Sequence, residues 1–281
     1  ELEIFLRLTH LILSIILDNI RYCLSYIIDI EAFMNHDLLK SVIYDQHEII
    51  KNFQIVPREY EFDLNANYVV VGLRRAGKST LLYKVVQDLI ENGTDWNQIV
   101  YINFEDERLS EFTVNDFNDI LSIQAEMSDK KGWFFLDEIQ NIDGWEKFAR
   151  RLADSKEHAF ITGSNAKMLS TEIENRLGGR YLTKYVTPYN FREYLAAKNI
   201  DFSEKALLAT KDSGKIKREM ENYFYFGGFP ENIVYKNKRE YVSSIYQKIL
   251  LGDIATRNGI RNNTGLRLLM KKIAELKAKY V

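Results

Sequence analysis

Gly72-Leu73-Arg74-Arg75-Ala76-Gly77-Lys78-Ser79-Thr80 follows the pattern G-x-x-x-x-G-K-[ST], which is typical of loops that bind the phosphates of nucleotides. Residues 68–71 directly before it are an apolar run with strand character, and apolar residues at helical spacing follow it as far as Ile90. The motif has its meaning in this order of strand, loop and helix. The sequence therefore predicts that residues 72–80 bind a nucleotide.

The residue types of this loop match what phosphate binding requires. Gly72 and Gly77 allow backbone angles and close approaches that a side chain would block. The loop amides then turn inward toward phosphate oxygens, and the helix that begins near Lys78 adds unpaired N–H groups and a positive dipole end. We expect Lys78 to reach the outer phosphates and the Ser79 hydroxyl to bind Mg²⁺.

A second motif follows at residues 133–138, where the apolar run Trp-Phe-Phe-Leu ends in Asp137 and Glu138. Continuous apolar runs are typical of buried strands in parallel sheets, and ligands of open α/β sheets bind beyond the carboxyl ends of such strands. We therefore expect Asp137 to hold Mg²⁺ through its water shell and Glu138 to orient or deprotonate an attacking water. The alternative is a surface pair of acids that caps the next turn. The phosphate loop upstream favours the catalytic interpretation.

A third segment has strand character at residues 159–162 and continues into Gly163-Ser164-Asn165. Small polar residues at the end of a strand of the same sheet are in reach of the terminal phosphate or the water. Gly, Ser and Asn also form ordinary turns, and the spacing leaves both interpretations open.

The remaining pattern alternates strands with helices. Strands are predicted at 68–71, 99–104, 133–136, 159–162 and 181–186, and helices at 37–53, 78–92, 113–127 and 145–155. Such alternation predicts an α/β fold of the P-loop type, with a five-stranded, mostly parallel sheet and helices on both faces. Residues from 189 onward are predicted to be mainly helical, with a break at 227–230.

The composition is that of a globular protein, with 46% apolar and 28% charged residues in a chain of 281. The single cysteine, Cys23, excludes an internal disulfide framework and agrees with a reducing cytoplasm, where we expect the protein to reside. The four histidines show no metal-ligand spacing, which argues against a zinc site.

Residues 1–33 form an uncertain apolar extension. Their apolar run, 8–17, is interrupted by Asp18 and Arg21, is too short to span a bilayer, and lacks the cleavage site of a secretory signal. No membrane association is expected. Met34 is interpreted as the native start, with 1–33 either an artefact or a docking helix. The predicted division is 34–198, a P-loop core with an N-terminal helix, and 199–281, a mainly helical part.

Charge is distributed unevenly along the chain. Residues 1–197 hold 21 Lys and Arg against 31 Asp and Glu, whereas residues 198–281 hold 17 against 9. This basic C-terminal part either meets an acidic partner, such as nucleic acid or the acidic first part of the chain, or is a solvated helical surface. The absence of a recognition motif favours the solvated surface.

Seven stretches, in the same order along the chain, resemble a prokaryotic ATPase family of the AAA class, in which a P-loop core precedes a C-terminal domain. The matching stretches are 72–80, 101–108, 135–140, 161–164, 177–181, 188–193 and 225–231. The resemblance implies ATP and Mg²⁺ as ligands. It also implies that residues 199–281 are a helical lid and the start of a C-terminal domain that continues well past residue 281.

The resemblance also implies roles for residues outside the loop. Ser164 or Asn165 would be the polar sensor on the fourth strand. Arg180, just before the fifth strand, falls where such proteins often carry an arginine finger, which a neighbouring subunit of a homo-oligomer supplies in trans. A surface ion pair is an equal alternative for Arg180. Arg176 is a weaker candidate for the finger.

The sequence leaves two functional hypotheses open. The first is an ATP hydrolase whose turnover moves the C-terminal domain. The second is a nucleotide-gated module with little intrinsic hydrolysis, in which ATP sets a conformation that holds DNA or a protein partner. The two-part layout and the charge split motivate the second.

Two arginines, Arg74 and Arg75, stand at the tip of the phosphate loop, where they either reach phosphate or are simply solvated.

Overall fold

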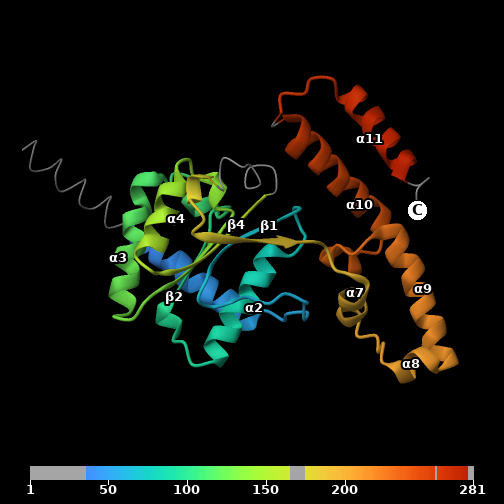
Figure 1. Cartoon of the computed structure of the whole chain (residues 1–281), viewed down its shortest axis with the longest axis horizontal. Helices are drawn as coiled ribbons and strands as arrows, with labels where there is room; N and C mark the ends of the chain where they lie inside the picture. Colours follow the sequence, from blue (N-terminus) through green and yellow to red (C-terminus); the bar gives the residue numbers. More distant parts are fainter. Residues whose placement is uncertain (1–35, 165–174, 257, 278–281) are drawn as a thin grey trace, which may run out of the picture.

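The computed structural model describes residues 36–164, 175–256 and 258–277, and the core of this part is a five-stranded sheet (Figure 1). Its strands are β1 (Asn67–Gly72), β2 (Ile99–Asn103), β3 (Trp133–Asp137), β4 (His158–Ser164) and β5 (Tyr181–Val186). The spatial order is β2-β3-β4-β1-β5, and all four pairings are parallel. The predicted α/β class and five strands are confirmed, with a sheet that is parallel throughout.

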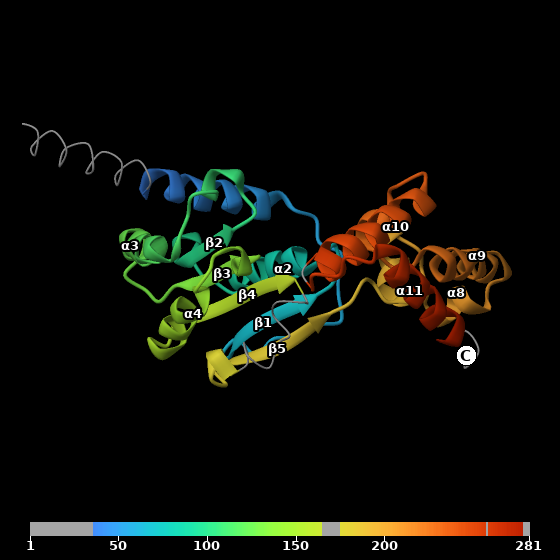
Figure 2. The same ribbon diagram turned by 90° about the horizontal axis from the view of Figure 1, so that it is seen from above.

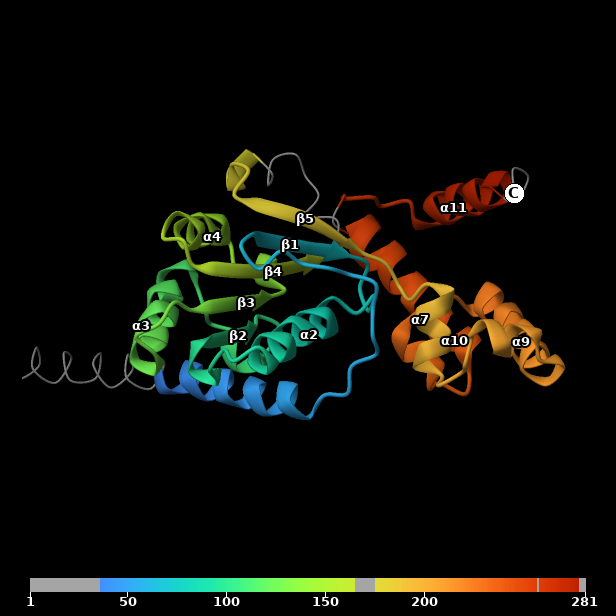
Figure 3. The same cartoon turned by 60° about the horizontal axis from the view of Figure 1, so that its bottom comes forward.

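Helices cover both faces of the sheet, as the alternating pattern predicts. The face with Val70, Tyr101 and Phe135 packs against α2 (Lys78–Glu91). The opposite face packs against α3 (Phe117–Met127) and α4 (Trp145–Asp154), as Figures 2 and 3 show. Because both faces are buried, the central strands are mostly apolar.

A helix at residues 36–52 runs beside β2, the strand at one edge of the sheet (Figure 2). Val42 and Ile43 join the core on the α3 and α4 side, whereas Ile50 joins the core on the α2 side. His47 Nε2 donates a hydrogen bond to the backbone oxygen of Ile99, 2.8 Å away, which ties the helix to β2. The helix thereby covers an edge that would otherwise be open to pairing with another strand.

Most predicted boundaries differ from the structure by one or two residues. The largest difference concerns the helix predicted from Thr113 to residue 127. Thr113 caps the 3₁₀ turn η3 (Val114–Asp116) through a capping box with Asp116, and α3 begins only after that turn. Short 3₁₀ turns are frequent at the N-termini of helices. Two further turns, η1 (Trp96–Gln98) and η2 (Glu107–Leu109), flank β2.

The C-terminal part is helical and lies beyond the carboxyl ends of the strands (Figures 1 and 2). Its elements are α7 (Phe191–Ala197), α8 (Glu204–Leu208), α9 (Thr210–Phe226), η5 (Pro230–Ile233), α10 (Lys238–Gln247), η6 (Lys248–Thr256) and α11 (Asn263–Lys277). The predicted break is present, because α9 ends at Phe226 before Gly227, whose φ is +70°. The predicted division after residue 198 lies directly after α7.

None of the helices within residues 36–164, 175–256 and 258–277 is both long enough and apolar enough to cross a bilayer. The apolar extension at 1–33 and its proposed end at Met34 lie outside the described residues.

Candidate active site

The phosphate-binding loop connects β1 to α2 and is held by close backbone contacts. A Cβ atom on Gly72 would stand 2.2 Å from the backbone oxygen of Val186 in the neighbouring β5, so the tight pairing requires glycine. Gly77, at the N-terminus of α2, has a φ of +92°, a conformation that residues with side chains rarely adopt. Glycine is therefore required at both positions, at Gly72 for lack of space and at Gly77 for its backbone conformation.

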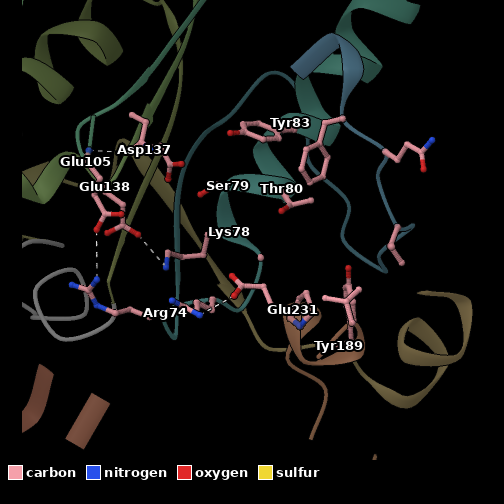
Figure 4. A pocket seen from close by; sticks show the side chains of 18 of the residues that line it. Arg74, Lys78, Ser79, Thr80, Tyr83, Glu105, Asp137, Glu138, Tyr189 and Glu231 are labelled. Atoms are coloured by element: carbon pink, nitrogen blue, oxygen red, sulfur yellow. Dashed lines mark hydrogen bonds and ion pairs between the residues drawn. The ribbon is translucent and has the colours of Figure 1, made fainter. Parts of the chain in front are cut away.

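Lys78 folds back over this loop and is buried. Its Nζ lies 3.4 Å from the backbone oxygens of both Gly72 and Leu73, and 3.3 Å from Oε1 of Glu138. Figure 4 shows the Lys78 and Glu138 side chains pointing toward one another across the mouth of the loop. The structure thus brings together two residues that the sequence motifs assign to phosphate binding and to water activation.

Asp137 ends β3 and is almost completely buried. Its carboxylate accepts hydrogen bonds from the hydroxyl groups of Ser79, Thr162 and Tyr101, and the Tyr101 bond measures 3.0 Å. Burial raises the pKa of Asp137 above its ordinary value, and the bonds from Ser79 and Thr162 oppose that rise. The carboxylate is therefore fixed beside the start of α2.

Glu138 follows in the left-handed backbone region, with a φ of +52°. Its backbone N–H donates to the Thr162 hydroxyl at 2.9 Å, and this bond holds the unusual conformation. The Gln140 side-chain amide, in η4 (Ile139–Asn141), donates to Oε2 of Glu138, while Lys78 contacts Oε1. Both carboxylate oxygens of Glu138 therefore have a partner.

The donor set at this point fits Mg²⁺ carried by phosphates. Ser79 and Asp137 supply hard oxygen atoms side by side, and Mg²⁺ in proteins is usually held by one or two such groups together with phosphates and water. Within the described ranges, no three His, Cys, Asp or Glu side chains gather as a metal cage. In the described residues, the donor set therefore fits a phosphate-bound cation better than a closed metal site.

A cleft of about 780 Å³ opens from these residues along the carboxyl edge of the sheet. Its volume is in the usual range for small-molecule sites. One end carries Lys78, Ser79, Asp137 and Glu138, as Figure 4 shows. The other end is bounded by less polar residues from four separate segments of the chain. These residues are Phe53, Val56, Tyr83, Tyr189, Pro230 and Val234.

Arg74 and Arg75 at the tip of the loop are held by carboxylates. Arg74 pairs with Asp253 at 3.2 Å and with Glu105 at 3.5 Å. Arg75 pairs with Glu231 at 2.8 Å. Asp253 and Glu231 belong to η6 and η5, so the loop tip contacts the C-terminal helical part directly.

A family model described as an AAA domain matches residues 65–195, which include all five strands, the phosphate loop and the two acids at the end of β3. Residues 65–195 are therefore similar to the AAA domain family.

Two curated relatives extend the likeness beyond the AAA domain. An uncharacterized protein of Methanocaldococcus jannaschii is 36% identical over 248 residues, which cover 85% of this chain and 54% of that protein. An uncharacterized protein of Haemophilus influenzae is 34% identical over 211 residues, which cover 74% of this chain and 50% of that protein. The chain thus spans about half the length of the curated relatives it matches.

Among solved structures, the closed state of Hsp104 with ATPγS and casein matches 69% of this chain and 36% of its own, at 14% identity and a TM-score of 0.42.

The remaining predicted residues of the AAA domain lie apart from the cleft or outside the described part. Ser164 ends β4 and pairs in register with Gly72, while its side chain and the whole of Asn165 lie outside the described residues. Arg180 precedes β5 and pairs with Asp154 at 2.6 Å. Because Tyr181 lies five positions before Val186 on β5, Arg180 stands roughly 17 Å or more from the level of the loop. Arg176 pairs with Glu146 at 2.9 Å.

Four residues that shape the site of the AAA domain were not predicted from the sequence. Tyr101 and Thr162 carry hydroxyl groups inside mostly apolar strands, a pattern that indicates buried hydroxyl groups but not their hydrogen-bond partners. The other two are Arg58 and Glu193, whose facing side chains are each 4% exposed. Arg58 follows Pro57 in an extended stretch where no pattern marks it.

Arg58 connects three segments around the loop. Its guanidinium donates to the backbone oxygens of Ala76 at 2.8 Å and of Thr187 at 2.7 Å, and to the carboxylate of Glu193 at 3.2 Å. The Glu193 carboxylate also accepts from the backbone N–H of Glu59 at 3.0 Å. This buried pair therefore fixes the phosphate loop of the AAA domain relative to α7.

Proposed function

We propose that this protein binds ATP with Mg²⁺ and hydrolyses it, and that turnover changes the position of its C-terminal helical part. The observation that carries the proposal is the convergence of Lys78, Ser79, Asp137 and Glu138 at one end of a cleft of about 780 Å³. A lysine, a hydroxyl and two acids beside a phosphate loop form the set that phosphoryl transfer to water requires.

The roles of these residues follow from their contacts. Lys78 leaves Oε1 of Glu138 for the outer phosphates, because an ammonium group beside a polyphosphate binds the stronger anion. Ser79 and Asp137 hold the cation that the nucleotide brings, and that cation supplies charge neutralisation on the phosphate oxygens. Glu138, with one oxygen released and the other held by Gln140, orients a water molecule toward the terminal phosphorus.

The less polar end of the cleft accommodates the base in this proposal. Phe53 and Val56 follow the helix at 36–52, whereas Tyr189 and Val234 belong to the C-terminal side of the cleft. An aromatic or aliphatic wall suits a planar purine, because it buries the base without requiring charged partners. The nucleotide would then contact both parts of the chain, which is the condition for its turnover to move one relative to the other.

A second candidate function is a nucleotide-gated binding module, which the basic residues of the C-terminal part favour. Lys211, Lys215, Lys217 and Arg218 are basic residues of α9. In this function, nucleotide binding sets a conformation that holds DNA or a protein partner, and hydrolysis is slow. A DNA affinity that falls with salt and changes with nucleotide would favour it, whereas no DNA binding at low salt would count against it.

The decisive experiment compares Mg²⁺-dependent ATP turnover by the wild-type protein and Glu138→Gln. We expect turnover to be lost and ATP binding retained, because the variant keeps the loop and removes only the acid that orients water. Glu111→Gln, an exposed site away from the cleft, is the matched control and should be unaffected. Normal turnover in Glu138→Gln would overturn the assignment. Tight ATP binding without turnover in either protein would favour the second candidate.

A further inference from the structure

The three cations of the phosphate loop are each paired with carboxylates, and these carboxylates come from different parts of the chain. Lys78 contacts Glu138, Arg75 contacts Glu231, and Arg74 contacts Asp253 together with Glu105. Glu138 and Glu105 follow strands of the core. Glu231 and Asp253 belong to the C-terminal helical part, so two of the three cations connect the loop to that part.

The Arg74–Asp253 pair is the better enclosed of these two connections. The side chains are 30% and 16% exposed, and Nε of Arg74 lies 3.2 Å from the Asp253 carboxylate. The Arg75–Glu231 pair is more exposed, at 42% and 47%. Because solvent and salt screen exposed ion pairs strongly, the Arg74 pair is the one expected to carry a measurable free energy.

Asp253 stands in an unusual piece of backbone. It belongs to η6, a π-helix over Lys248–Thr256, and Lys248 of the same element lines the cleft. Wide helical turns of this kind are rare and are found frequently at functional sites. Leu250 and Ala255 of η6 are buried, so a displacement of Asp253 also shifts packed side chains of the C-terminal part.

The guanidinium that Asp253 holds belongs to a residue that lines the cleft. Arg74 stands on the loop whose backbone cradles phosphates and beside Lys78, as Figure 4 shows. A polyphosphate offers more negative charge than one carboxylate and matches the planar guanidinium equally well. Phosphate and carboxylate therefore compete for Arg74.

We propose that Asp253 is an affinity-determining residue of the site, which competes with the phosphates of a bound nucleotide for Arg74. Nucleotide binding then breaks the Arg74–Asp253 ion pair and releases η6 from the phosphate loop. This inference rests on the proposed function only in requiring that the cleft binds a nucleotide. The Arg74–Asp253 pair then connects the loop physically to the C-terminal part, so that nucleotide in the cleft affects how that part is held.

Competition and a purely structural role predict opposite changes in nucleotide affinity when Asp253 is substituted. Thermodynamic linkage requires that, if nucleotide binding breaks the pair, breaking the pair strengthens nucleotide binding by the same factor. Asp253→Asn should therefore tighten binding of ATPγS, by about two- to tenfold for a partly enclosed pair. A residue that only supports the fold would weaken binding when it is changed.

The experiment measures the ATPγS affinity of the whole chain for the wild type, Asp253→Asn, Arg74→Ala and the double variant. We expect Asp253→Asn to tighten binding in the wild-type background. It should have no effect once Arg74 is alanine, because the guanidinium for which Asp253 and the phosphates compete is then absent. Asp212→Asn, which removes an exposed carboxylate on α9, is the matched control and should bind as the wild type does.

A second readout follows η6 itself by amide hydrogen exchange over residues 248–256. Saturating ATPγS should accelerate exchange there in the wild type, and Asp253→Asn should show fast exchange before any nucleotide is added. Unchanged or weaker ATPγS binding in Asp253→Asn, or tightening that persists in the Arg74→Ala background, would overturn the inference and leave the proposed function standing. Absence of ATPγS binding by the wild type would overturn both.

Discussion

Oε1 of Glu138 lies 3.3 Å from Nζ of Lys78, so the residue proposed to orient water and the residue proposed to bind phosphate hold one another. The pair is nearly buried, which makes each charge depend on the other for compensation. A phosphate that takes over Lys78 therefore also releases Glu138. Binding and the preparation of the attacking water are coupled through this single contact in the proposed reaction.

Gln140 is the second partner of Glu138 and should affect catalysis more than binding. Its amide donates to Oε2, so that Gln140→Leu leaves the carboxylate held at one oxygen only. We expect kcat for ATP to fall by roughly 10- to 100-fold, a typical cost of a misplaced catalytic group, while KM changes little. Steady-state kinetics separate the two constants, with Gln98→Leu as the control, because the Gln98 amide also donates a hydrogen bond but lies outside the cleft lining, in the turn before β2. A raised KM at unchanged kcat would refute this role.

The Arg58–Glu193 pair should be important for stability, because breaking it leaves a charge buried. We expect Arg58→Met alone to lower the free energy of unfolding by about 3–5 kcal/mol and the double variant with Glu193→Leu to recover part of the loss. Urea denaturation measures both. Arg192→Met is the matched control, since Arg192 approaches Glu59 only to 4.0 Å at an exposed position. Equal stability of Arg58→Met and Arg192→Met would contradict the prediction.

The sequence indicated those parts of the site whose motifs are supported by the residues next to them in the chain. The phosphate loop lies between a strand and a helix, and the Asp137–Glu138 pair ends an apolar strand, so each motif was predictable from its neighbours in the chain. Thr162 and Tyr101 were not, because their contact with Asp137 depends on the spatial order of β2, β3 and β4.

The sequence did not indicate the partners of Arg74 and Arg75 for a similar reason. Their partners Asp253 and Glu231 lie 179 and 156 positions further along the chain. Ion pairs over such separations follow from how the C-terminal helices sit against the loop, which no local pattern records. Likewise, Arg58 obtains its role only when β5 and α7 bring Thr187 and Glu193 to it.

His47 should make stability depend on pH. Burial lowers its pKa below the ordinary value, and the charge of Lys51 lowers it further, while the bond to Ile99 and the charge of Glu48 act in the opposite direction. The folded protein therefore binds this proton less readily than the unfolded chain. Its contribution to stability is complete above the unfolded pKa, about 6.5, and is lost as pH falls toward the lower folded value.

The measurement is the free energy of unfolding of the wild type and His47→Gln across this range. Between about pH 7.5 and about pH 5, the wild type should lose more stability than the variant, because only the wild type has this titrating group. Gln retains a side-chain N–H for the Ile99 oxygen, so the comparison isolates the titration. Parallel pH curves for the two proteins would show that burial of His47 has no such effect.

Arg180 stands at the amino end of β5, roughly 17 Å or more along the strand from the level of its own phosphate loop. It lies away from the cleft of its own chain and pairs with Asp154. If it acts in trans as a finger, Arg180→Ala should lower kcat by roughly a thousandfold or more while ATP binding persists. Arg176→Ala, four residues earlier and also in an ion pair, is the matched comparison.

Mixing two inactive variants distinguishes action in trans from a local structural role. Arg180→Ala retains its own phosphate loop, and Lys78→Ala retains its own Arg180, so a mixed oligomer contains interfaces where both are intact. We expect the mixture to recover part of the turnover that neither variant shows alone. A mixture that stays inactive, although subunits exchange freely, would leave Arg180 as the partner of Asp154 and remove it from the reaction.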